Sequence, residues 1–69
     1  MDRAVLLAHL AQAERHISQG EHHIARQREI VAELDGPDAV KANELLALFE
    51  KLQAMHVADR DHLRAKLVA

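Results

Sequence analysis

The chain has no cysteine, tryptophan or tyrosine, a single phenylalanine, one proline and two glycines among its 69 residues. Without cysteine there is no disulfide scaffold, no thiol nucleophile and no thiolate zinc site. So few glycines and prolines argue against an all-β fold, which needs a turn every few residues. No apolar run approaches the roughly 18 residues of a membrane span, and Met1-Asp2-Arg3 opens no signal peptide. We therefore expect a cytoplasmic chain without a membrane segment.

Length and charge narrow the class further. A chain this short predicts a single domain over residues 1–69. Nine Lys/Arg residues against eleven Asp/Glu give a formal charge of −2, which is not the clustered basic footprint of a nucleic-acid-binding protein. With 49% hydrophobic residues, the chain is too apolar to be disordered. We expect a folded domain, and we do not expect nucleic acid to be its main partner.

The chain contains one strong turn signal, the run Asp35-Gly36-Pro37-Asp38. Glycine suits the left-handed residue that ends a helix, and proline cannot continue one. Asp2 and Asp38 are suited to capping the amino ends of two helices. The sequence thus predicts an all-α fold with helices at about 2–35 and 38–67, and a turn this short makes them antiparallel.

The first predicted helix carries a continuous heptad pattern, with apolar or small residues at alternating intervals of three and four. Position a holds leucine or β-branched side chains, and position d is small in the middle. The seam positions, in order, are Leu6, Leu10, Ala13, Ile17, Gly20, Ile24, Gln27, Val31 and Leu34. The pattern predicts a coiled-coil seam against the second helix.

The second predicted helix is less regular. With Phe49 at position a, the seam positions are Ala42, Leu45, Phe49, Leu52, His56, Asp59, Leu63 and Lys66. An antiparallel hairpin then pairs residues whose numbers sum to about 73. This pairing suggests that Gly20 and Ala13 are small because Phe49 and His56 need the space.

The apolar residues of the second helix cover a wider arc than one neighbouring helix can bury. Chains below about 70–80 residues seldom build an adequate core alone. We therefore expect two hairpins to dimerise into a four-helix bundle. The predicted interface residues are Leu45, Leu46, Leu48, Phe49, Leu52 and Met55.

Histidine is the one unusual chemical resource, with six in the chain. The hairpin pairing brings His16 near His56, and Asp59 follows one helical turn later. These three residues are the candidates for a metal site or a proton-responsive site. The competing interpretation, which we prefer, is a buried His56 bonded to Asp59, with no metal and no cofactor.

Catalytic patterns are missing from the sequence. Ser18 is the only hydroxyl side chain, and the chain has neither a glycine-rich phosphate loop nor the Glu-x-x-His pair of di-iron bundles. A nucleophile with an adjacent base cannot be assembled from these residues. The sequence therefore predicts a protein that is not an enzyme.

Three runs carry a resemblance to other proteins. They are Glu-Arg-His-Ile at 14–17, Gly-Glu-x-His-Ile-x-Arg-Gln at 20–27, and Leu-Leu-x-x-Phe-Glu-x-Leu-Gln-x-x-His-x-x-Asp-Arg at 45–60. Together they cover most of the chain, which resembles short uncharacterised helical proteins of alphaproteobacteria, rhizobia especially. The resemblance implies a bacterial cytoplasmic protein and no particular activity. The architecture is also similar to Rop-type helical hairpins, which implies a dimeric bundle that binds RNA.

These observations lead to one functional hypothesis and two alternatives. The leading hypothesis is a small, non-catalytic, self-associating interaction or structural module that docks a protein partner. The first alternative is a metal- or pH-responsive bundle that uses His16, His56 and Asp59. The second is a Rop-like RNA-binding regulator.

Overall fold

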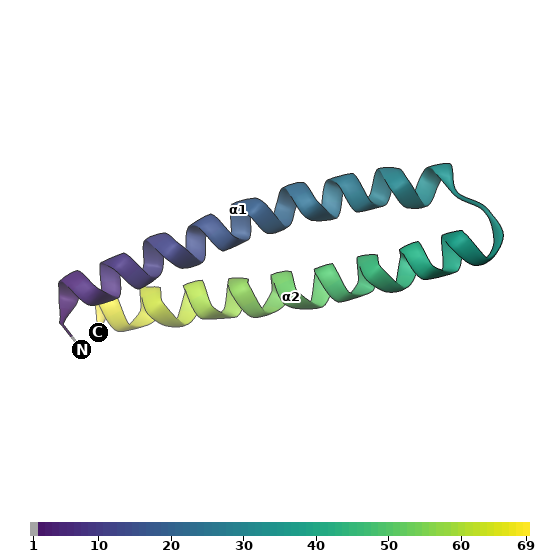
Figure 1. Ribbon diagram of the computed structural model, residues 1–69. Helices are drawn as coiled ribbons and strands as arrows, with labels where there is room; N and C mark the ends of the chain where they lie inside the picture. Colours follow the sequence, from purple (N-terminus) through teal and green to yellow (C-terminus); the bar gives the residue numbers. More distant parts are fainter. Residues whose placement is uncertain (1) are drawn as a thin grey trace.

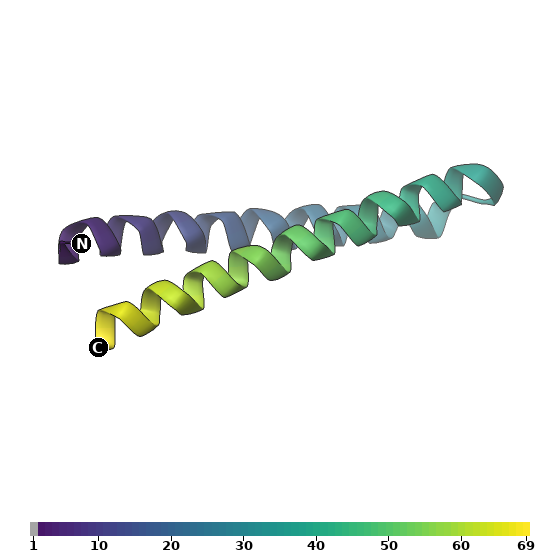
Figure 2. The same cartoon turned by 90° about the horizontal axis from the view of Figure 1, so that it is seen from below.

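The computed structural model describes residues 2–69 as two antiparallel helices, α1 (Arg3–Glu33) and α2 (Gly36–Val68). Figure 1 shows the two ends of the chain side by side, with the turn at the opposite end of the hairpin. The hairpin is a rod of 51 × 14 × 13 Å, and its helices cross at a shallow angle in Figure 2. This confirms the predicted all-α hairpin. Neither helix has a stretch that is long and apolar enough to cross a membrane.

The turn is placed differently from the prediction. Helix α1 ends at Glu33 and α2 begins at Gly36, so the predicted boundaries at residues 35 and 38 are each wrong by two residues. The reason is that Leu34 and Asp35 are both extended, with ψ 155° and 161°, and Gly36 then adopts φ +61° at the start of α2. Glycine reaches this left-handed conformation without the steric cost that a Cβ would bring. The following Pro37 lies in the first turn of α2, where a missing N–H costs nothing.

The two helix starts use their acidic residues in different ways. Asp2 caps α1 as predicted, because its Oδ1 accepts a hydrogen bond from the Ala4 N–H at 3.0 Å. Asp38 does not cap α2, since it lies within the first turn and Asp35 occupies the N-cap position without a side-chain bond. There the Asp38 carboxylate still interacts favourably with the positive end of the helix dipole.

The seam of α1 follows the predicted register. Its a and d positions are all buried or half-buried, and Leu6, Ala13, Ile17 and Gln27 are the most buried. The buried Gln27 is satisfied, because its Nε2 donates to the Ala42 carbonyl of α2 at 2.9 Å. A buried amide without such a partner would be costly. The hydrogen bond therefore ties the turn end of the two helices together.

The seam of α2 differs from the prediction in one of its two rows. Its predicted a row faces α1 as expected, but the predicted d row is exposed to solvent. The residues that face α1 instead lie one position later in the sequence. The exposed row is Leu45, Leu52, Asp59 and Lys66, and the row that replaces it is Leu46, Gln53, Arg60 and Leu67.

The small residues of α1 accommodate this second row. A Cβ added at Gly20 would collide with Oε1 of Gln53 and lie 2.7 Å from its Cδ. The Gln53 Nε2 donates to the Ile17 carbonyl at 2.8 Å. The residue that needs the space at Gly20 is thus Gln53, and the prediction that assigned it to Phe49 or His56 is wrong.

The hairpin leaves much of its apolar surface uncovered. No side chain among residues 2–69 is fully buried, and the accessible surface is 5070 Å². A compact protein of this mass is expected to expose roughly 4,300 Å². One helix pair therefore makes a thin core.

Candidate functional site

The hairpin has two long sides with different chemistry. We call one the histidine face, because His9, His16 and His23 of α1 line its clefts with Leu52 and His62 of α2. The opposite side, the charged face, is lined by Glu14 and Glu21 of α1 and by Arg60 and Arg64 of α2. The proximity of His16 to His56 was predicted from the sequence, whereas the position of the α2 leucines beside the histidines was not.

A central cleft of about 200 Å³ lies on the histidine face. Its lining residues are His16, Gln19, Gly20, His23, Phe49, Leu52, Gln53 and His56. The His16 and His56 rings approach to 4.9 Å between centroids, and the His23 and Phe49 rings approach to 5.9 Å. The predicted proximity of His16 and His56 is therefore found in the structure.

A hydrogen-bond chain along α1 positions the His16 ring. Arg15, which has only donors, donates to Oε1 of Gln12. The Gln12 Nε2 then lies 2.8 Å from Nε2 of His16. The Gln12 amide therefore links the Arg15 guanidinium to the imidazole of His16.

The third candidate, Asp59, lies in the neighbouring cleft toward the chain ends. That cleft holds Asp59 together with His9, His16 and His62, whereas His56 lines the central cleft. Within residues 2–69 the structure contains no group of three or more His, Asp or Glu side chains arranged to hold a metal ion. His16, His56 and Asp59 therefore line adjacent clefts and do not form a single metal centre.

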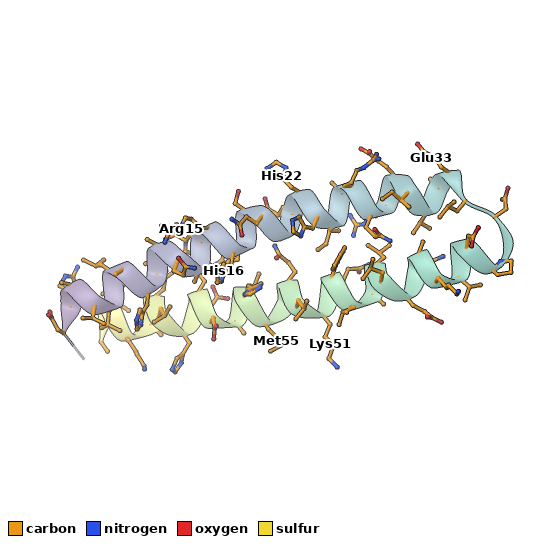
Figure 3. The ribbon with its side chains drawn as sticks, in the orientation of Figure 1. Arg15, His16, His22, Glu33, Lys51 and Met55 are labelled. Atoms are coloured by element: carbon orange, nitrogen blue, oxygen red, sulfur yellow. The ribbon has the colours of Figure 1, made fainter. Side chains whose placement is uncertain are left out.

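The predicted interface residues divide into two groups. Leu46 and Phe49 are half-buried in the intrahairpin seam. The remaining four recur at intervals of three, four and three along one side of α2, and their exposed fractions are Leu45 42%, Leu48 50%, Leu52 42% and Met55 60%. We call these four residues the leucine stripe. Figure 3 shows Met55 on the side of α2 that faces away from α1.

The charged face has no comparable stripe. Its cleft places two carboxylates of α1, Glu14 and Glu21, beside two arginines of α2, Arg60 and Arg64. Arg60 is also paired with Asp61 at 3.0 Å. Because acids and bases alternate, this face is neither a basic patch nor an apolar one.

No protein-family model, curated protein or solved structure matches this chain. The resemblance to short alphaproteobacterial proteins stays a prediction. The function is therefore inferred from the chemistry of the two faces.

The sequence did not reveal the roles of Gln12 and Gln53. Gln12 could have been identified from its spacing, because residues three and four apart on a helix are neighbours and Arg15 and His16 follow it at those intervals. Gln53 was not among the predicted seam residues of α2. The missed signal was Gly20, whose lack of a side chain leaves space for a long one on α2.

Proposed function

We propose that the protein is a non-catalytic, self-associating helical module, in which two hairpins form an antiparallel four-helix bundle. The observation that carries the proposal is the leucine stripe. Its spacing is that of a second coiled-coil seam on a helix that already has one. Single exposed leucines are common on monomers, but four in register along one helix face favour an interface.

The thin core supports the same proposal. The surface in excess of a compact monomer is several hundred Å² per chain by the comparison above, and stable interfaces bury about 800 Å² per partner. Covering the leucine stripe would supply much of that area. Complete burial of an exposed leucine contributes about 1.5–3 kcal/mol, and the four residues are still 42–60% exposed in the hairpin, so covering them favours association.

The test is the mass in solution. Sedimentation equilibrium at about 0.1 mM should report about 15 kDa, twice the 7.7 kDa of one chain. Leu52→Lys should return the mass to that of the monomer, because the charge would be buried at the interface. The control is Val40→Lys, since Val40 is 58% exposed and lies off the stripe. A wild-type monomer would overturn the proposal.

Loss of the dimer and loss of the fold can be separated. The melting temperature of the wild-type protein should rise with protein concentration if folding and association are coupled. A melting temperature that does not depend on concentration, found together with a monomeric mass, would show a stable single hairpin. The two measurements together show whether Leu52→Lys breaks the dimer or unfolds the hairpin.

A second candidate function is a proton-responsive bundle, and the contact between His16 and His56 favours it. Protonation of both rings would place two positive charges about 5 Å apart. Asp59 is the carboxylate that lines the same cleft as His16, so it partly offsets this repulsion. A pH titration of assembly tests this candidate.

A further inference from the structure

We infer that the two copies pack histidine face to histidine face with their turns at opposite ends, so that Leu48 of one copy meets Leu52 of the other. This inference rests on the proposed self-association and adds the face, the direction and the register. It follows from the order of residues along the exposed side of α2.

The exposed side of α2 is a palindrome in chemistry as well as in spacing. Its residues at alternating intervals of three and four are Asp38, Lys41, Leu45, Leu48, Leu52, Met55, Asp59 and His62. A two-fold axis that runs two helices antiparallel pairs residues with a constant sum. With a sum of 100, Leu48 pairs with Leu52 and Leu45 pairs with Met55, so the apolar centre covers itself.

The ends of the palindrome carry opposite charges. With the same sum, Lys41 of each copy meets Asp59 of the other, and Asp38 meets His62. All four side chains are exposed in the hairpin, so their charges are available to a partner. Two symmetry-related Lys41–Asp59 pairs would flank the apolar centre, which is the arrangement by which charged positions select a partner and its orientation.

The same-end arrangement lacks this complementarity. With both turns together, α2 of one copy would lie along α1 of the other. Residues of the two chains would then face each other at the same heights along the bundle as within one hairpin, where His16 lies beside His56 and His23 lies beside Phe49. Asp38 would then meet Glu33, and Leu45 would meet Arg26. Like charges and an uncovered leucine disfavour that arrangement.

In the opposite-end register the two α2 helices also overlap along nearly their whole length. The centre of the palindrome is residue 50, and α2 runs from Gly36 to Val68, so the axis lies close to the middle of the helix. The central cleft, which Leu52 and His16 both line, is then covered by the second copy. Along α1, Gln19 then lies close to His23 of the second copy.

A charge-swap experiment tests the register. Lys41→Asp should place two carboxylates opposite each other at both symmetric positions and raise the dissociation constant roughly tenfold or more. Asp59→Lys should do the same with two lysines. The double variant Lys41→Asp/Asp59→Lys restores opposite charges, and we expect a dissociation constant within about threefold of the wild-type value.

The matched control is Lys51→Asp, the same charge change at another exposed lysine of α2. Figure 3 shows Lys51 pointing away from α1, and the residue is not one of the eight that form the palindrome. This variant should dimerise like the wild type. If the double variant is as weak as the two single changes combined, the register is wrong even though the protein dimerises.

A distance measurement tests the direction independently. The chain has no cysteine, so Ala65→Cys introduces a unique site for a spin label on the outer side of α2. In the opposite-end dimer the two labels are separated by about 45 Å along the bundle, from 30 residues at 1.5 Å each. Labels about 25 Å apart, the width of the bundle, would show turns at the same end. A wild-type monomer would instead overturn the proposed function itself.

Discussion

The two sides of this hairpin are built from the same two helices and differ in almost every property. The histidine face combines imidazoles and amides around the central cleft, and Leu52 of the leucine stripe lines that cleft. The charged face places Glu14 and Glu21 beside Arg60 and Arg64 around a cleft of about 190 Å³. This volume is similar to that of the central cleft, so the two clefts differ in the chemistry of their linings.

The two sides of the rod differ in how much free energy it would cost to remove them from water. Interspersed opposite charges keep a surface solvated and contribute little to stability. Neutral imidazoles and amides have no such charge to desolvate, so they can be covered at lower cost. We therefore expect changes on the histidine face to alter assembly, and changes on the charged face to have small effects.

The largest expected effect is that of pH on the histidine face. Acid protonates histidine side chains, and the His16 and His56 rings lie 4.9 Å apart, so covering two charged rings costs more than covering two neutral ones and assembly weakens as the pH falls. Between about pH 7.5 and 5.5 we expect the dissociation constant to rise roughly a hundredfold, measured by sedimentation. His16→Gln/His56→Gln should reduce the change.

The control for this prediction is His22→Gln. Figure 3 shows His22 pointing away from α2, so the variant removes one histidine without touching either cleft. It should keep the full pH dependence. Equal dissociation constants at both pH values would show that assembly does not depend on protonation of the histidine face.

An intermediate effect is expected where Gly20 meets Gln53. Alanine normally stabilises a helix by about 1 kcal/mol relative to glycine. Here Gly20→Ala would displace the Gln53 amide and remove its hydrogen bond to Ile17, so the net gain should vanish or reverse. In a Gln53→Ala background the same change should stabilise the protein by about 1 kcal/mol.

Thermal unfolding of the four members of this cycle measures the coupling. Ser18→Ala supplies the comparison on the other side, because Ser18 lines the charged-face cleft and its replacement creates no collision. If Gly20→Ala stabilises the wild-type protein as much as it stabilises the Gln53→Ala variant, Gln53 does not depend on the missing side chain.

The smallest effects are expected on the charged face. Glu21→Gln and Arg64→Gln should each change the free energy of unfolding by less than about 0.5 kcal/mol, because exposed ion pairs contribute little. The dissociation constant should stay at its wild-type value. A large loss of assembly from either change would show that the charged face also takes part in contacts.

The sequence predicted α1 better than α2 for a physical reason. The apolar residues of α1 form a narrow stripe, so only one register fits them. In α2 the residues Leu45, Leu46, Leu48, Phe49 and Leu52 spread over a wide arc, and two registers one residue apart fit almost equally well. Each of the two alternative rows contains two polar residues, so polarity does not decide between them.

The choice between these registers depends on the opposite helix. Gly20 provides the space for Gln53, and the backbone carbonyl of Ile17 accepts a hydrogen bond from its Nε2. Such a pairing requires both helices at once, so a periodicity read along one helix cannot reveal it. The candidate site was predicted more fully, since the contact between His16 and His56 followed from the length of the turn alone.

The adjacent chain ends at one tip of the rod have a consequence for any larger construction. Arg3 donates to the carbonyl of Leu67 at 3.4 Å, so both ends leave the hairpin at the same tip. In the opposite-end dimer the two tips point away from each other. The bundle would then act as a rigid strut that holds whatever is attached to its two copies roughly 50 Å apart, with both attachment points of each copy on the same side.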